Sequence, residues 1–426
     1  MEATRIRLAE GVHLTYLPAR KFKTSLLSAQ FVTPLRRETA GANALLAAVL
    51  RRGTVSCPDM GALSAKMDNL YDASIDYTVR KKGENQCVGF VASFLDDAFA
   101  PGGEPILEPA AGLLGELLLR PRLQDGIFAE EYVSGERANL VDRIRGQIND
   151  KRSYATLRLG QLMCGEEAFG VDKLGDVEHA AAVTPGSLWE RYQQLLSTAQ
   201  IELYYCGSAE EERVARALKE ALSALPVNEG RICPDCEVRL HAGPEPSMVE
   251  ESMDVTQGKL AMGFRTGGVT CWEEEYPAMA MCNAVFGGTT LSKLFMNVRE
   301  KLSLCYYASS TLEKMKGLIL VSSGIEFDKF QQARDEILHQ LEEIRQGNME
   351  DWELEGTRRT MIGAHLATLD VQDRQEDFWL GQTAAGLETG IEELVAQLEQ
   401  VTREQVAQAA QKLELDTIYF LKGTEG

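Results

Sequence analysis

The chain has 426 residues, of which 44% are hydrophobic, and 44 Lys and Arg against 64 Asp and Glu give a formal net charge of −20 at pH 7. This length suits roughly two to four domain-sized units, and the apolar content excludes a disordered or fibrous class. The acidity and the lack of a basic cluster argue against nucleic acid as a partner. The charged, alternating start MEATRIRLAEGVHLTY is unlike a signal peptide, and the longest apolar stretch, AAGLLGELLL, covers about half of a membrane span. The sequence therefore predicts a cytoplasmic protein that has no membrane partner.

Nine cysteines are scattered along the chain, most of them inside apolar runs. Their odd number and their positions indicate reduced, buried thiols, as in a cytosolic protein. Only Cys233-Pro-Asp-Cys236 has the spacing of metal ligands, and a zinc ribbon would need a second such pair. The sequence leaves a role for Cys233 and Cys236 open.

The first half begins with alternating strand patterns that turn at Glu10-Gly11, and SLLSAQFV is a further strand. The pattern then predicts, in order, helices over 41–52 and about 59–70, strands SIDYTVRKK and NQCVGFVAS, and helices near 109–119 and 127–148. After further helix, VTPGSLWERYQQLLSTAQIELYYCG predicts a capped helix that leads into a strand.

The second half repeats this order. KLAMGFRTG is a strand, YPAMAMCNAVFGG and LSKLFMNVREKL are helices, and CYYASSTL and LILVSSGIE are two more strands. Long amphipathic helices follow near 327–346 and 349–368, and the closing VTREQVAQAAQKLELDTIYFLKG parallels the capped helix and strand of the first half. Self-similarity over about 200 residues indicates duplication of one α+β unit.

The segment 226–254 is rich in Pro, Gly and acidic residues and has weak periodicity, which is typical of a linker. We therefore expect an α+β fold with an N-terminal lobe at 1–225 and a C-terminal lobe at 255–426. Two similar lobes joined by a linker suggest a clamshell around a central cavity, which is a common place for a ligand.

Zinc hydrolases commonly place two histidines one turn apart on a helix, with a glutamate as general base. No two histidines of this chain stand three or four residues apart; the five are His13, His179, His241, His339 and His365. A nucleophile elbow, a Gly-rich phosphate loop and a dinucleotide fingerprint are also missing from the sequence. Local sequence alone therefore assembles no catalytic or metal site.

Three stretches stand out together: LAEGVHLTYLPARKFKTSLLSAQFV, GANALLAAVLRRGT and, in the second half, SKLFMNVREKLSLCYY. They resemble the first strands, the zinc helix (G-x-A-H-x-x-E-H-x-x-x-x-G-T) and the S-R-L-F-x-x-x-R-E-x-x-G-L-x-Y segment of the pitrilysin/insulinase (inverzincin) family. This family of zinc peptidases includes mitochondrial processing peptidase, and the similarity spans essentially the whole chain. GERANLVDRIRGQINDKRSYATLRLGQLMCGEEAFG is also similar to a Gram-positive bacterial subgroup associated with elongation factor P modification.

The resemblance places the family's metal residues at positions that cannot hold zinc here. Its H-x-x-E-H falls on 44–48, so Ala44 and Ala48 replace the two histidine ligands and Ala47 replaces the glutamate base. The third ligand, a glutamate, falls on Arg143 in ERANLVDR, or on Asp142 if the alignment shifts by one. A methyl group cannot bind zinc or accept a proton, and arginine cannot ligate zinc. We therefore expect no zinc cofactor and no catalysis by this chain.

The resemblance also implies substrate contacts that this chain keeps. Arg299 and Tyr306 match an arginine and a tyrosine that contact substrate or the reaction centre in the family's peptidases, although a salt bridge and a packed ring would explain them equally well. Family substrates add a strand to a sheet edge beside the zinc helix, and the corresponding stretch is Ala73, Ser74, Ile75, Asp76 and Tyr77. Strand addition needs only free backbone groups, so peptide binding is compatible with loss of the metal.

Three functions remain open. The first is a non-catalytic, peptide-binding subunit of a heterodimeric zinc peptidase, whose partner is an active paralogue with an intact zinc motif. The second is a stand-alone peptide-binding or scaffold protein, a homodimer without peptidase activity. The third is an enzyme with an unfamiliar site that uses Cys233 and Cys236. We favour the first hypothesis because inactive chains of the family commonly pair with an active one.

Overall fold

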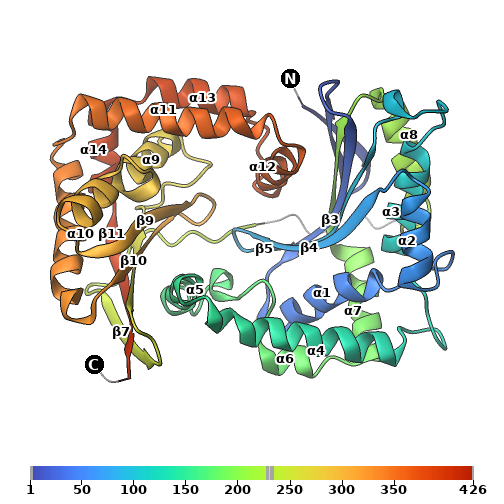
Figure 1. The fold of residues 1–426 in the computed structure, drawn as a ribbon, viewed down its shortest axis with the longest axis horizontal. Coiled ribbons are helices and arrows are strands. Elements are labelled where there is room, and N and C mark those ends of the chain that lie inside the picture. Colours follow the sequence, from blue (N-terminus) through green and yellow to red (C-terminus); the bar gives the residue numbers. More distant parts are fainter. Residues whose placement is uncertain (1–2, 227–229, 231–234, 425–426) are drawn as a thin grey trace. The chain divides into compact units, whose positions relative to one another are not determined.

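The computed structural model describes residues 3–226, 230 and 235–424, which form two compact units, each built around one β-sheet (Figure 1). Unit 1 and unit 2 are assembled from alternating pieces of the chain: Met1–Arg145, Val171–Asp235 and Val371–Glu388 in unit 1, and Gly146–Gly170, Cys236–Asp370 and Thr389–Gly426 in unit 2. In the part of the chain that is described, no helix has both the length and the apolar character needed to cross a bilayer.

The sheet of unit 1 has six strands in the order β1-β2-β6-β3-β5-β4, so β4 lies at one edge. Only β2 and β6 pair in parallel, and all other neighbours are antiparallel. The strands are β1 (Thr4–Ala9), β2 (Val12–Pro18), β3 (Thr24–Pro34), β4 (Ser74–Lys82), β5 (Asn85–Leu95) and β6 (Gln200–Gly207). The predicted turn at Glu10-Gly11 joins β1 to β2, and the φ of 61° at Gly11 is one that glycine adopts without strain.

The sheet of unit 2 has five strands in the order β7-β11-β8-β10-β9, with β7 and β11 as its parallel pair. The strands are β7 (Ser247–Met253), β8 (Gly258–Arg265), β9 (Cys305–Glu313), β10 (Leu318–Ile325) and β11 (Glu414–Gly423). Apart from β1, the two sheets have the same strand order and the same parallel pair. The predicted α+β class with two homologous lobes is therefore confirmed.

The helices of unit 1 that come from the first half of the sequence cover one face of its sheet and form a large apolar core with it. They are α1 (Arg37–Leu50), α2 (Met60–Asp68), α3 (Leu107–Leu119), α4 (Glu130–Gly146), α6 (Val177–Ala181), α7 (Pro185–Thr198) and α8 (Glu211–Ala221). The helices of the second half are α9 (Tyr276–Asn283), α10 (Phe330–Arg345), α11 (Asp351–Thr368), α12 (Gln372–Ala384), α13 (Ile391–Gln400) and α14 (Arg403–Gln411), with π-helical segments at Ala284–Gly288 and Leu294–Lys301.

The last helix before the closing strand begins in the same way in each half. Thr184 before α7 and Thr402 before α14 are N-caps, and the side chain of each accepts a hydrogen bond from the backbone N–H three residues further on. The residue at that third position bonds back to the N-cap backbone, which completes a capping box. The predicted Val-Thr starts of these two helices are therefore confirmed.

Each unit includes one helix from the other half of the sequence. α5 (Lys151–Met163), from the first half, packs on β8, β10 and β11 of unit 2. α12, from the second half, packs on β3 and β6 of unit 1. The two helices occupy equivalent places in the duplication, because each is the next α-helix after a long one, α4 or α11. The exchange is thus reciprocal, and it was not part of the boundaries predicted from the sequence.

Buried ion pairs attach α12 to unit 1, and the segment after α5 to unit 2. In unit 1, Arg80 of β4 forms a bidentate pair with Glu376 of α12, with N–O distances of 2.5 and 2.8 Å. In unit 2, Glu167, shortly after α5, lies 2.7 Å from Arg265 and 2.6 Å from Lys316, and both cations are fully buried. Breaking such a pair by removing one partner leaves an uncompensated buried charge, so these contacts hold the exchanged segments in place.

The structure changes one detail of the predicted linker. Strand β7 lies inside the segment 226–254 that the sequence indicated as linker, and it pairs in parallel with β11. β7 is an edge strand with no buried residue, and two of its residues, Glu250 and Glu251, are acidic. Such a strand lacks the apolar alternation by which strands are identified from sequence.

Candidate functional site

The three alanines of α1 are structural residues of a buried helix. Ala44, Ala47 and Ala48 are 3%, 1% and 8% exposed, and the two leucines between them are fully buried. α1 packs on β4 and β5 of the sheet and on α6 and α7. Alanine suits this place because it has the highest helix propensity and fills little space. None of the three methyl groups can ligate a metal or accept a proton.

Arg143, the residue that the resemblance aligns with the family's third zinc ligand, is a cation. Arg143 lies on α4, is exposed, and donates a hydrogen bond of 3.2 Å to the hydroxyl of Tyr77 on β4. The neighbouring acid of the same motif, Glu136, is paired with Arg52 at 3.1 Å. In the described part of the chain, no three His, Cys, Asp or Glu side chains are grouped so that they could hold a metal ion. With methyl groups and a guanidinium at the ligand positions, these residues do not fit zinc.

The predicted peptide-binding stretch lies at the edge of the sheet of unit 1, because β4 has only one neighbouring strand. Ala73 and Ile75 are buried, Ser74 and Asp76 are exposed, and Tyr77 is half-buried. This alternation is typical of a strand with one face on the core.

Arg51, directly after α1, contacts this edge. Its Nε donates a hydrogen bond of 2.8 Å to the carbonyl of Ile75, and its guanidinium lies 3.2 Å from the carboxylate of Asp76. Arg51 could not be predicted from its sequence context, because an arginine that follows a helix does not indicate which backbone group it will contact.

Arg299 and Tyr306 both belong to unit 2. Arg299 lies in the π-helical segment Leu294–Lys301, 4.6 Å from the centre of the Phe295 ring and 3.5 Å from the carboxylate of Glu300. Tyr306, at the start of the edge strand β9, is 60% exposed and donates a hydrogen bond of 2.8 Å to Glu326, which raises its pKa. Among the described residues, no hydrogen bond joins their side chains. Neither is held in a buried ion pair. Arg299 has unused N–H donors for a ligand, whereas the single O–H of Tyr306 is already donated to Glu326 and would first have to leave it.

Most of the described cysteines lie in the apolar interior. Seven of the eight are buried, and Cys271 is half-buried. Burial raises the pKa of the Cys87 and Cys282 thiols to about 12, far from the value at which a thiolate forms at neutral pH. Cys236 is buried, and Cys233 lies outside the described residues.

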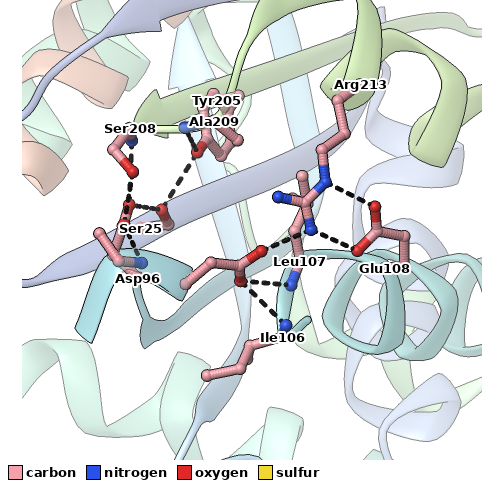
Figure 2. A network of polar contacts seen from close by, with 11 residues as sticks. Ser25, Asp96, Ile106, Leu107, Glu108, Tyr205, Ser208, Ala209 and Arg213 are labelled. Carbon is pink, nitrogen blue, oxygen red and sulfur yellow. Dashed lines mark hydrogen bonds and ion pairs between the residues drawn. The ribbon is translucent and has the colours of Figure 1, made fainter. Parts of the chain in front are cut away.

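A cavity of about 200 Å³ lies in unit 1 beside a network of polar contacts (Figure 2). Asp96 accepts hydrogen bonds from Ser25 at 2.7 Å, from the hydroxyl and backbone N–H of Ser208, and from the backbone N–H of Ala98. Burial alone would raise the pKa of Asp96, but these hydrogen bonds outweigh it and lower the pKa. Both oxygens of the carboxylate are therefore already satisfied.

The second half of the network joins two helices. Asp97 accepts hydrogen bonds from the backbone N–H groups of Ile106 and Leu107 at the start of α3, and it pairs with Arg213 of α8. Arg213 also pairs with Glu108 (Figure 2). A carboxylate at a helix N-terminus satisfies donors that have no partner within the helix. Because each carboxylate oxygen already has a donor, we interpret the network as one that fixes the loops after β5 and β6 and not as a ligand site.

Comparison with known proteins agrees with this geometry. The family model of the Peptidase M16 inactive domain matches residues 182–361. The Bacillus subtilis protein named "Probable inactive metalloprotease YmfF" is 35% identical over 418 residues, which cover 98% of this chain and 97% of that protein. A crystal structure of a conserved protein from Enterococcus faecalis V583 superposes with a TM-score of 0.91 at 28% identity over 100% of both chains. The M16 inactive domain from Pseudomonas fluorescens has the same fold, with a TM-score of 0.80 at 17% identity over 100% of this chain and 99% of that one.

The match to YmfF extends over nearly the full length of both proteins. The resemblance to the pitrilysin/insulinase peptidases is thereby confirmed, as is the expectation that this chain has no catalytic activity. The chain belongs to the M16 peptidase family, as an inactive homologue.

Proposed function

We infer that this chain is a peptide-binding, non-catalytic subunit of an M16 zinc peptidase, which pairs in the bacterial cytoplasm with an active paralogue. The observation that carries this proposal is the contrast between α1 and β4. The ligand positions of α1 hold buried methyl groups, while the adjacent β4 remains at the edge of its sheet. An edge strand binds an extended peptide through backbone N–H and C=O groups, which a change of side chains on α1 leaves intact.

The exposure of Arg299 and Tyr306 supports the part of the proposal that concerns catalysis in the complex. Both side chains carry donors that are directed to weak or exposed partners rather than to the core. A guanidinium and a phenol of this kind can hold a peptide carbonyl or stabilise a developing negative charge when the partner supplies the metal.

The test is co-expression with a paralogue, encoded in the same genome, that has an intact H-x-x-E-H motif. We expect a 1:1 complex that contains this 47.0 kDa chain, and peptide hydrolysis that requires both proteins. A matched complex in which the glutamate of the paralogue's motif is replaced by glutamine should assemble equally well and lose activity, because the general base lies in the partner.

Two results would overturn the proposal. If the purified chain has twice its monomer mass and does not bind the paralogue, the homodimeric scaffold becomes the better description. If a complex forms but kcat/KM of the paralogue is the same with and without this chain, the inferred contribution to substrate binding is wrong.

A further inference from the structure

Two arginines, one directly after α1 and one on α4, contact the first half of β4. One of them, Arg51, has a carboxylate partner, and the other, Arg143, has none in the described part of the chain. Arg51 is paired with Asp76 at 3.2 Å. Arg143 donates to the hydroxyl of Tyr77, which is a neutral partner, and no described carboxylate lies within ion-pair distance of it. In the second half of the strand, Arg80 is paired with Glu376 and Lys82 with Asp377. Of these four cations, only Arg143 therefore lacks a carboxylate.

The contact with Tyr77 leaves most of the hydrogen-bonding capacity of both groups unused. A guanidinium has five N–H donors, and only one of them is occupied here. The Tyr77 hydroxyl accepts from Arg143 and still has its own proton to donate. An exposed guanidinium and a phenolic O–H that lie 3.2 Å apart are a suitable pair of donors for one carboxylate.

Arg51 limits where a peptide can pair with the strand. In an antiparallel ladder the N–H and C=O of one residue point to the same side, and successive residues alternate. Because the Ile75 carbonyl accepts from Arg51, it points away from β5, and so do the backbone groups of Tyr77 and Val79. Arg51 occupies the first of these outward positions. An added strand therefore begins its pairing at Tyr77, directly beside Arg143.

We propose that the edge of β4 takes an acidic peptide, with one carboxylate of the peptide held by Arg143 and the Tyr77 hydroxyl. The inference rests on the proposed peptide-binding function and adds the chemical class of the peptide. The carboxylate is either an Asp or Glu side chain or the C-terminal carboxylate of the peptide, since both present the same two oxygens. Arg143 selects among peptides, while the backbone of β4 supplies the binding that is common to all of them.

The experiment uses two pools of random octapeptides, one with amidated and one with free C-termini, passed over the immobilised full-length chain. Retained peptides are sequenced by mass spectrometry, and a few are resynthesised with Glu changed to Gln for affinity measurement. The variants are Arg143→Gln and, as the matched control, Arg145→Gln. Arg145 is an exposed arginine in the same turn of α4 with no described contact to β4. Both side chains are exposed, so neither change is expected to prevent folding.

We expect the wild-type chain to retain peptides enriched in Asp and Glu, or to retain the free-acid pool in preference to the amidated pool. The first result assigns a side-chain carboxylate and the second the C-terminal carboxylate. The Glu-to-Gln change in a retained peptide should weaken binding by about tenfold or more. Arg143→Gln should abolish this preference and still retain peptides, whereas Arg145→Gln should behave as the wild type.

Peptide binding without an acidic preference, or a preference that survives in Arg143→Gln, would overturn the assignment of Arg143 and leave the peptide-binding function standing. If the wild-type chain retains neither pool, the peptide-binding function itself fails, and the assignment fails with it.

Discussion

Replacing Glu376 by Gln tests the exchange of helices between the two halves. Glu376 lies on α12, in the second half of the sequence, and pairs with Arg80 on β4 of unit 1. Its side chain is 3% exposed, and that of its partner Arg80 is 19% exposed. Breaking a buried ion pair by removing one partner costs about 3–5 kcal/mol. Arg80 keeps a contact of 3.2 Å with Asp377 and some access to water, which reduces the expected loss to about 2–3 kcal/mol.

The assay is amide hydrogen exchange, since it reports the free energy of opening for each unit separately and needs no two-state assumption. Protection should fall in β3 and β4 of unit 1 and stay unchanged in β8 and β10 of unit 2. The control is Glu388→Gln, which removes the same charge from an exposed position of the same segment. Exchanging both partners for apolar residues, Arg80→Met with Glu376→Leu, should restore most of the stability. A loss below about 0.5 kcal/mol for Glu376→Gln, or a loss confined to unit 2, would refute this reasoning.

Three further predictions follow from the structure. A protease site inserted after the exposed Gly243 allows the chain to be cut into two fragments, which should stay associated in size-exclusion chromatography. The reason is that α5 and α12 each lie in the unit formed mainly by the other fragment. Separate elution of the fragments would contradict the exchange of these helices. Asp96→Asn should destabilise unit 1 by about 1–3 kcal/mol at pH 7 in urea unfolding. The pKa of the Asp96 carboxyl is lower in the folded than in the unfolded chain. The stability that Asp96 contributes is therefore fully present above the unfolded pKa of 3.8 and is lost as the pH falls through the folded pKa. The wild type and the variant should have the same free energy of unfolding at a pH below the folded pKa. Arg299→Ala in the complex should lower kcat/KM by about tenfold or more, while the exposed neighbour change Lys301→Ala should have little effect; equal values for both would remove the role of Arg299.

Local patterns were sufficient to predict the duplication. The capping threonines, Thr184 and Thr402, act on backbone groups only three residues away, and the apolar faces of α1 and α3 follow from their own composition. These features depend on neighbours in the sequence, which is why they were predicted correctly.

The exchange of α5 and α12 depends on partners in the other half of the chain. The buried positions of α12 include Gln372, Gln375 and Glu376, which read as solvent-exposed in a helix taken alone. Gln372 is buried because it bonds to Thr24 and to the carbonyl of Cys206, groups that no periodicity in 372–384 could indicate.

The candidate site was predicted in part. The ligand positions were assigned through the resemblance to the family, and an alanine or an arginine at such a position excludes zinc in any conformation. The contact of Arg143 with Tyr77 and that of Arg51 with the Ile75 carbonyl were not, because they join a helix end to a strand that lies 24 to 66 residues away in the chain. Only the folded chain brings Arg51 and Arg143 to the edge of β4.

Loss of the metal site is tested by measuring the zinc content of the purified chain with inductively coupled plasma mass spectrometry. Its peptide hydrolysis is measured with and without chelator. We expect substoichiometric zinc and no hydrolysis that a chelator can remove, because methyl groups and a guanidinium occupy the positions that align with the family's ligands. One zinc ion per chain, with hydrolysis lost on chelation, would contradict this expectation.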